Sequence, residues 1–375
     1  MLSYIIIFFS LLIIPQIFPK RFHNSICFFI LLIFMSIRFN VGWDFRWYYP
    51  LGEKFHFLNY SIFLDLKDAI IIMEESFDKY LWNYARLEFI NKILYYITWQ
   101  LQNPQTIIFL YSFLSLFFIK LGLDYFKRKR NVPYIWLFFY CFPLFFFKYV
   151  SIMRQAVAVS IIFYSYKFIN KKLLKNFLFC VFIASLFHNS AKYMIILYLF
   201  NYIKLKRFFI YIIFLLTFFS KPLVLFCITK ISFFHRYIAY VTLHKGGGDK
   251  IYYIILSMTI FLIIFWKKLV SKDPSNKKIM HIFFIGCSLY LSLNEMGHIG
   301  IRSSIYFLIF GLYLIPSIFF IFKGQQQLIK ILYILGLFFL LNINLYLDKK
   351  NVNNSEFVPY RIFFINPNKL NDWQP

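Results

Sequence analysis

Three arginines interrupt or border the apolar parts of this sequence, and a guanidinium group is well suited to hold a phosphate. The clearest case is Arg154, within the apolar run FPLFFFKYVSIMRQAVAVSIIF at residues 142–163. A cation that faces lipid costs roughly 2.5–3.5 kcal/mol on insertion scales, so a functional reason is expected. If a helix begins near Ser151, Arg154 and Gln155 lie in its first turn, where unpaired N–H groups and the helix dipole favour an anion. The spacing therefore predicts that both residues bind a phosphate-bearing substrate.

Arg38 and Arg302 are the other candidate phosphate ligands, and each has an alternative interpretation. Arg38 ends the apolar run at residues 25–39, and Arg302 follows the segment NEMGHIGI, with Tyr306 one turn further on. An arginine at the end of a membrane span can also extend its side chain to the interface and have no further role. We expect Arg38, Arg302 and Tyr306 to contact substrate, and the interfacial interpretation stays open for both arginines.

His188 and Asp44 are the candidates for proton transfer. His188 lies in LFHNSAKY, and the ordinary pKa of histidine suits a general base near neutral pH. Asp44, in RFNVGWDFRWYY, is either the alternative base or the group that orients His188 or an arginine. Tyr48, in the same segment, is a candidate substrate ligand. A hydrogen-bonded interfacial histidine is the alternative for His188, and an interfacial aromatic belt is the alternative for Tyr48.

The elements that must position these residues are membrane-spanning helices. The chain has 375 residues, of which 61% are hydrophobic and 15% are charged, and its mean hydropathy is +0.66. Apolar runs recur along the whole length, so the sequence predicts an all-α polytopic integral membrane protein with about 11–12 spans. The spans are expected near residues 3–18, 25–39, 105–122, 134–148, 152–168, 176–189, 190–203, 208–229, 251–266, 279–293, 303–322 and 331–347.

The distribution of charge predicts an orientation and argues against nucleic-acid binding. The net charge is +26, but the cations gather in alternate short loops between the apolar runs, which is typical of cytoplasmic loops. Both termini are then external. Residues 40–104, which hold more than half of the 15 acids, are expected to form a large external loop containing short helices, with a re-entrant or interfacial helix at 88–102. Residues 348–375 form an external tail, residues 1–375 form a single membrane domain, and all eight candidate site residues lie on the external face.

Several enzyme classes lack support in the sequence. No DxD, HExxH or Walker pattern occurs, so a glycosyltransferase with a metal-bound sugar nucleotide and an ATP-driven pump are both unsupported. The Gly-rich segment LHKGGGDK, at residues 243–250, follows no strand and lacks the GxxxxGK[ST] pattern, which predicts an external loop. The five cysteines show no CxxC spacing and are interpreted as small buried hydrophobic residues. We therefore expect neither a metal nor a cofactor.

The candidate residues lie in short motifs that resemble those of EpsG-type proteins, in the order in which that family carries them. The similar segments are RFNVGWDFRWY at residues 38–48, FP at 142–143, RQAVA at 154–158, FHNSA at 187–191, RSSIY at 302–306 and VPY at 358–360. The family's Glu-Pro/Gly-aromatic motif occurs here only as Glu88-Phe89, without the Pro or Gly, so no role is assigned to Glu88. The resemblance covers nearly the whole chain.

The resemblance implies a polysaccharide polymerase, because EpsG-type proteins are grouped with the Wzy polymerases. Its substrates would be oligosaccharide repeat units on undecaprenyl pyrophosphate, joined into O-antigen, capsular polysaccharide or exopolysaccharide at the outer face of the bacterial cytoplasmic membrane. The reaction would be a metal-independent glycosyl transfer in which arginines hold the pyrophosphate. The expected partners are the lipid bilayer and a chain-length regulator or other polysaccharide-assembly proteins, with no nucleic acid. A lipid-linked oligosaccharide flippase, an O-antigen ligase and a membrane O-acetyltransferase are the alternatives.

Overall fold

A computed structural model describes residues 1–55, 78–129, 134–202, 211–217, 249–272, 276–293, 298–350 and 355–364, together with residues 208, 226 and 230. Every regular element in these ranges is helical, so the predicted all-α class is confirmed. The elements are α1 (Leu2–Ile17), η1 (Lys20–Phe22), α2 (His23–Ser36), α3 (Phe45–Gly52), α5 (Lys79–Ala85), α6 (Phe89–Gln100), α7 (Gln105–Lys129), α8 (Ile135–Cys141), α9 (Phe146–Ser151), α10 (Met153–Asn170), α11 (Leu174–Phe187), η3 (Asn189–Asn201), α14 (Asp249–Lys272), α15 (Asn276–Leu293), α16 (His298–Leu308), α17 (Gly311–Leu314), η6 (Pro316–Phe320), η7 (Lys323–Gln325) and α18 (Gln326–Lys350).

Three helices in the described part of the chain are long and apolar enough to cross a membrane. They span Gln105–Phe126, Ile251–Ser271 and Gln326–Lys350. Two shorter helices, α1 and α11, are also apolar. The protein is therefore a helical membrane protein, as the composition predicts. The span predicted at 208–229 and the Gly-rich loop at 243–250 fall largely outside the described residues.

Two predicted spans are interrupted in the structure. The run at 134–148 is divided into α8 and α9, because Pro143 has no N–H to continue the helical hydrogen bonds. The run at 303–322 is divided into α16, α17 and η6, and the 3₁₀ helix begins at Pro316. All residues of α8 except its first are buried, as are all four of α17. Broken helices of this kind are stable at membrane depth only where protein surrounds them.

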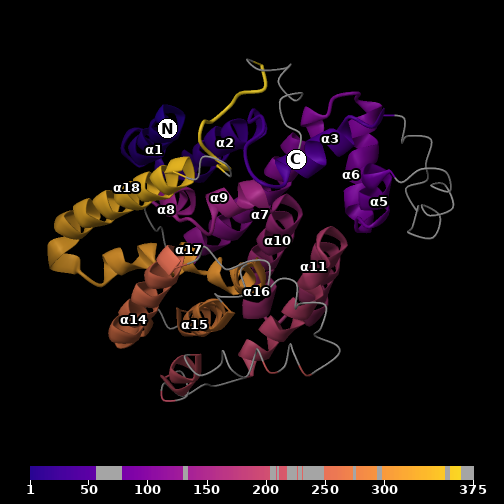
Figure 1. Ribbon diagram of the computed structural model, residues 1–375. Coiled ribbons are helices and arrows are strands. Elements are labelled where there is room, and N and C mark those ends of the chain that lie inside the picture. Colours follow the sequence, from indigo (N-terminus) through magenta and orange to yellow (C-terminus); the bar gives the residue numbers. More distant parts are fainter. Residues whose placement is uncertain are drawn as a thin grey trace.

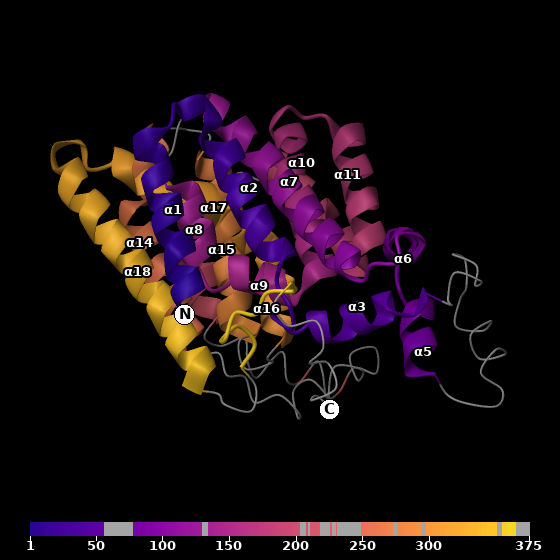
Figure 2. The same cartoon turned by 90° about the horizontal axis from the view of Figure 1, so that it is seen from above.

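The helices form a bundle with two distinct ends, which lie at the bottom and the top of Figure 2. α10 packs against α7 and α11, α7 also packs against α2, and α15 packs against α16. α3 and α5 lie at one end, here named the site end, and the α1–α2 and α10–α11 connections lie at the opposite end, here named the basic end. Figure 1 shows α18 and the α5–α6 pair at opposite edges of the bundle. α6 has 12 residues, so it is too short to cross a hydrocarbon core of about 30 Å.

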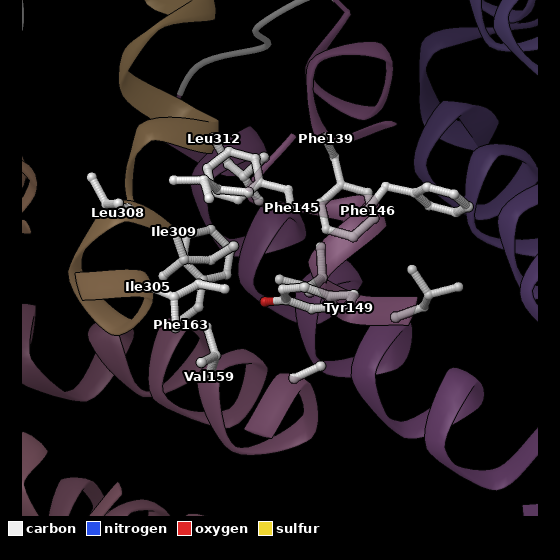
Figure 3. Packing of buried hydrophobic residues seen from close by; sticks show 14 of the residues in the cluster. Phe139, Phe145, Phe146, Tyr149, Val159, Phe163, Ile305, Leu308, Ile309 and Leu312 are labelled. Carbon is white, nitrogen blue, oxygen red and sulfur yellow. The ribbon is translucent and has the colours of Figure 1, made fainter. Parts of the chain in front are cut away.

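The core packs aromatic side chains from the interrupted α8–α9 region against α10, α16 and α17 (Figure 3). Phe139 and Phe145 lie parallel with ring centroids 6.3 Å apart, and Tyr149 meets Phe139 edge-on at 5.2 Å. Val159 and Phe163 of α10 face the same cluster. This packing fixes the short helices that precede α10, and therefore the position at which α10 begins.

The C-terminal segment, residues 355–364, returns to the site end and pairs with the residues that follow α2. Phe39 N donates to Arg361 O and Phe363 N donates to Ile37 O, each at 2.9 Å. The carboxylate of Asp348 at the end of α18 accepts the backbone N–H groups of residues 356, 357 and 358, each at 2.8 Å. The segment therefore joins the end of α18 to the connection between α2 and α3.

Candidate active site

A small pocket at the site end gathers most of the residues that the sequence analysis singled out. Its volume is about 50 Å³. The side chains come from α3, α10, α16 and the residue that follows α11. The pocket is lined by Asp44, Tyr48, Ile152, Arg154, Gln155, His188 and Arg302. Six of the eight predicted site residues thus meet at one place, although they are as far apart in the sequence as Asp44 and Arg302.

Arg154 lies in the first turn of α10 and is held by two partners. Its Nε donates to the phenol oxygen of Tyr48 at 2.5 Å. Its Nη1 pairs with the carboxylate of Glu88, also at 2.5 Å, and the side chains of Arg154 and Glu88 are 24% and 20% exposed. The guanidinium carbon lies 5.6 Å from the centre of the Tyr48 ring, within the range of a cation–π contact. These contacts fix the direction of the guanidinium. The Nη2 atom takes part in neither the hydrogen bond to Tyr48 nor the ion pair with Glu88.

Glu88 is the residue of this site that the sequence analysis did not include. Its Oε2 accepts from Asn91 at 3.0 Å as well as from Arg154, and its Oε1 accepts from the backbone of Asn189 at 3.2 Å. Asn91 in turn donates to Phe187 O at 2.8 Å and accepts from Tyr111 at 2.9 Å. The carboxylate therefore ties α6 to α10 and to the start of η3. The available signal was the Glu88-Phe89 pair itself, without the glycine or proline of the family motif.

Asp44 occupies the position at the start of α10 where the sequence predicts a phosphate. Its Oδ2 accepts the backbone N–H of Met153 at 2.7 Å, and its own N–H donates to Ser151 O at 3.2 Å. The carboxylate thus satisfies one of the unpaired N–H groups in the first turn of α10. Burial raises the pKa of Asp44 to about 6, against the opposing effect of the cations Arg154 and Arg302.

Gly42 sets the path of the chain that delivers Asp44. Its φ angle is +90°, and a Cβ at this position would lie 2.6 Å from the carbonyl oxygen of Val150. A side chain is therefore excluded both by the backbone conformation and by the close approach to α9. The Gly42 N–H donates to Glu356 O at 2.8 Å, and the Glu356 carboxylate accepts from the Ser151 hydroxyl at 2.7 Å. Glu356 of the C-terminal segment thus holds Gly42, two residues before Asp44, and Ser151, two residues before Met153.

His188 follows the last residue of α11, and a hydrogen-bonded chain orients its ring. Its Nδ1 lies 2.7 Å from the Ser190 hydroxyl, which lies 2.9 Å from the phenol oxygen of Tyr306. Tyr306 is fully buried and does not line the pocket, so it supports His188 through Ser190. Burial lowers the pKa of His188 to about 3, and the positive charges of Arg154 and Arg302 act in the same direction. The imidazole is therefore neutral at physiological pH.

Arg302 differs from Arg154 in being exposed and less constrained. It lies on α16, which the amide of Gln155 connects to α10 by donating to Arg302 O at 2.7 Å. Within the described parts of the chain, the Arg302 guanidinium has no hydrogen bond and no ion pair. The side chains of Glu295 and His298, which belong to the same sequence segment, lie outside the described residues. Arg302 is therefore the cation that a ligand entering the pocket could contact at the least cost.

Arg38 is placed elsewhere, away from the pocket. Its side chain is 1% exposed, and its guanidinium donates to Met35 O, to Val41 O at 3.2 Å and to the Ser112 hydroxyl at 3.1 Å. The Met153 sulfur lies 2.9 Å from its Nη2. These acceptors are neutral, and they belong to α2, α7, α10 and the connection after α2. The geometry makes Arg38 an internal link between α2, α7 and α10.

The family comparison covers nearly the whole molecule. The model of the EpsG family matches residues 21–362, a range that includes every pocket residue and most of the C-terminal segment. Comparison with curated proteins and with solved structures finds no match. In the described residues, no group of three His, Cys, Asp or Glu side chains is arranged to hold a metal ion.

Proposed function

The chain belongs to the EpsG family, and from that premise we propose that it joins oligosaccharide repeat units carried on undecaprenyl pyrophosphate into a polysaccharide. The product would be an O-antigen, a capsular polysaccharide or an exopolysaccharide. The observation that carries the proposal is the pocket itself, in which two arginines lie beside a carboxylate and a neutral histidine at one end of a membrane-embedded bundle. This set matches the needs of transfer from a lipid pyrophosphate.

The leaving group defines the role proposed for the arginines. When the bond between the anomeric carbon and the pyrophosphate oxygen breaks, the electron pair stays with the pyrophosphate, and its negative charge grows. A preorganised cation lowers the energy of that state. Arg302, which is exposed, would contact the pyrophosphate first, and Arg154, held by Tyr48 and Glu88, would stabilise the developing charge. Gln155 keeps the two helices that carry these arginines in register.

The acceptor hydroxyl defines the role proposed for Asp44 and His188. The hydroxyl oxygen forms the new bond to the anomeric carbon, and its proton must pass to a base. Asp44 suits this role better than an ordinary aspartate, since its pKa is raised to about 6, near the operating pH. His188, which is neutral because its pKa is lowered, would orient the hydroxyl. The hydroxyl of Tyr48 would complete the substrate contacts.

A complementation experiment tests the function. A strain that lacks the gene is supplied with the wild-type chain, with Arg154→Ala, with His188→Ala, or with Arg21→Ala as the matched control at the basic end. Surface polysaccharide is then separated on a gel. A polymerase that has lost its activity leaves single repeat units on the cell surface, whereas Arg21→Ala should give full-length chains. Loss of all surface sugar would favour a flippase or a ligase, and full-length chains from both site variants would contradict the proposed site.

The proposed orientation places the pocket at the outer face of the bacterial cytoplasmic membrane. The basis is the concentration of cations in the loops of the opposite end. Single cysteines at Asn40 and Lys129, in a background without native cysteines, test it by labelling of intact cells with a membrane-impermeant reagent. Asn40 should react from outside, and Lys129 should not. The reverse pattern would turn the pocket toward the cytoplasm and remove the basis for an external polymerase.

A further inference from the structure

The C-terminal segment brings a carboxylate, that of Glu356, to the region where the candidate base Asp44 lies. Figure 2 shows this segment in yellow at the site end, close to α9. The Glu356 Oε2 atom accepts from the Ser151 hydroxyl at 2.7 Å, and the Glu356 carbonyl oxygen accepts from the Gly42 N–H at 2.8 Å. One residue near the C-terminus therefore contacts both the segment that carries Asp44 and the end of α9.

Ser151 connects Glu356 to Asp44 through its two polar groups. Its hydroxyl donates to Glu356, and its carbonyl oxygen accepts from the Asp44 N–H at 3.2 Å. Ser151 is 2% exposed, so water has little access to compete for either contact. The Asp44 carboxylate in turn accepts from the Met153 N–H at 2.7 Å. Glu356 is therefore separated from the proposed base by a single residue.

The backbone around Glu356 is held in place by its own neighbours. The Glu356 N–H donates to the Asp348 carboxylate at 2.8 Å. The carbonyl oxygen of Phe357 accepts from the Tyr4 hydroxyl at 2.8 Å. The Phe357 ring meets Phe147 of α9 edge-on, with ring centroids 4.9 Å apart. The backbone that carries the Glu356 carboxylate is therefore anchored to α18, α1 and α9.

Glu356 also adds negative charge near a carboxylate that two cations face. Burial raises the pKa of Asp44 to about 6, the charge of Glu356 acts in the same direction, and Arg154 and Arg302 oppose it. Removal of the Glu356 charge should therefore lower the pKa of Asp44. In the described part of the chain, the charged and titratable groups around Asp44 are Tyr48 of α3, Arg154 of α10, His188 after α11, Arg302 of α16 and Glu356 of the C-terminal segment.

We propose that Glu356 is a positioning residue for Asp44, because it holds Gly42 and Ser151 at the spacing that keeps the Asp44 carboxylate at the start of α10. This inference rests on the proposed function, in which Asp44 accepts the proton of the acceptor hydroxyl. Glu356 does not line the active-site pocket, so it acts through Ser151 and Asp44 and not through contact with substrate.

Two substitutions separate the hydrogen bond of Glu356 from its charge. Glu356→Gln keeps an oxygen that can accept from Ser151 and loses the charge, whereas Glu356→Ala loses both. Incorporation of labelled repeat units in membrane vesicles is measured at a series of pH values and substrate concentrations and normalised to folded protein. Glu356→Ala should lower kcat about tenfold with KM unchanged, because the base is less well oriented. Glu356→Gln should restore most of kcat and move the pH midpoint down by about half a pH unit.

Glu53→Gln is the matched control, since it removes an exposed carboxylate at the end of α3. The length of α3 places Glu53 about 13 Å along the helix axis from Asp44. This control should keep the wild-type kcat and the wild-type pH midpoint. A wild-type midpoint in Glu356→Gln, or a wild-type kcat in Glu356→Ala, would overturn the inference. An equal shift of the midpoint in the control would do the same.

A stability measurement tests the coupling of Glu356 to Asp44 without the activity. The melting temperature of the purified full chain in detergent is measured at a series of pH values for the wild type, Glu356→Gln, Asp44→Asn and the double variant. The loss of stability as the pH rises through the pKa of Asp44 should move to lower pH in Glu356→Gln. In the Asp44→Asn background, Glu356→Gln should leave the pH profile unchanged.

The two measurements distinguish failure of this inference from failure of the proposed function. An equal effect of Glu356→Gln on the pH profile with and without Asp44 would overturn the link between the two carboxylates. A shift that requires Asp44, in a chain whose vesicles form no polymer, would support the link and overturn the proposed function alone.

Discussion

Arg154 and Arg38 both lie near the site end of the bundle, but the two side chains have opposite surroundings. The Arg38 guanidinium is 1% exposed and donates to carbonyl and hydroxyl oxygens and to a sulfur, all of them neutral. The Arg154 side chain is 24% exposed, borders a pocket and pairs with the carboxylate of Glu88. The first guanidinium joins segments of the fold, and the second faces a site where a ligand can enter.

The two arginines differ in the charge of their partners, and this difference underlies the separate roles proposed for them. A guanidinium with several neutral backbone acceptors fixes the backbone, and its removal leaves those acceptors unsatisfied. A guanidinium with a single carboxylate partner can exchange that partner for a phosphate, since both groups accept the same forked donors. Glu88 therefore holds Arg154 in a defined direction, and under the proposed function it would compete with the substrate phosphate for the guanidinium.

The largest expected effect on activity follows removal of the Arg154 guanidinium group. Arg154→Gln should lower the rate of polymer formation about 1,000-fold, the scale of losing one preorganised charge-stabilising donor. Arg154→Lys keeps the charge but loses the two directed contacts to Tyr48 and Glu88, so it should recover only part of the activity. Incorporation of labelled repeat units in membrane vesicles measures both rates. Normal rates with Arg154→Gln would remove Arg154 from the catalytic site.

Arg38 should show the opposite pattern, with a large effect on stability and a small effect on activity per folded molecule. Arg38→Leu leaves the buried acceptors at Met35, Val41 and Ser112 without their donor, which should cost about 3 kcal/mol. Thermal unfolding in detergent measures the stability, and the vesicle assay is normalised to folded protein. Wild-type stability together with lost activity would show that Arg38 acts on substrate after all.

A smaller effect is expected at Gly42, whose backbone lies close to Val150 of α9. Gly42→Ala should destabilise the protein by about 2 kcal/mol, because alanine disfavours a φ of +90° and its Cβ would approach Val150 O too closely. Gly336→Ala on α18 is the matched control, since no atom lies within 4 Å of its Cβ position. That control should be neutral or slightly stabilising. Equal melting temperatures for the two variants would contradict the close approach.

The smallest expected effect is a shift in pH dependence at the pocket. If Asp44 is the base, activity rises with pH as its carboxyl ionises, with a midpoint near its pKa of about 6. Arg302 favours the ionised form, so Arg302→Gln should raise that pKa and move the midpoint to higher pH. His188→Gln should leave the midpoint unchanged, because His188 stays neutral above pH of about 3. A midpoint that moves with His188 instead would assign the base to histidine.

Asp44 also makes stability depend on pH. Its pKa is raised in the folded state, so folding takes up protons between the ordinary carboxyl pKa and about 6. The contribution of Asp44 to stability is therefore greatest at low pH and is lost as the pH rises through about 6. The Asp44→Asn variant should lack this decrease in stability near pH of about 6, as measured by the melting temperature at a series of pH values. A pH profile identical to that of the wild type would show that the pKa of Asp44 is not raised.

The sequence predicted the helical membrane class and most of the pocket, for identifiable reasons. Apolar composition and loop charges depend on local sequence alone, and the EpsG-like motifs carry Asp44, Arg154, His188 and Arg302 directly. Glu88 was given no role because its motif lacks the Pro or Gly of the family, and the sequence does not show that it pairs with Arg154, 66 positions away. The sequence also could not show that Arg38 links segments inside the protein. An arginine at the end of a span can serve equally well as a phosphate ligand or as an internal link. The helix breaks at Pro143 and Pro316 were not predicted, because they are stable only where other helices pack around them.

The C-terminal segment has a consequence for the order in which the candidate active site is assembled. Every pocket residue lies at or before position 302, yet the backbone of Gly42 and the hydroxyl of Ser151 are fixed by Glu356. A chain emerging from the ribosome can therefore insert its helices before these two contacts exist. These contacts also depend on α18, because Asp348 near its end accepts the backbone N–H groups of residues 356, 357 and 358. These two contacts of the pocket region therefore form only after residue 356 has been added to the chain.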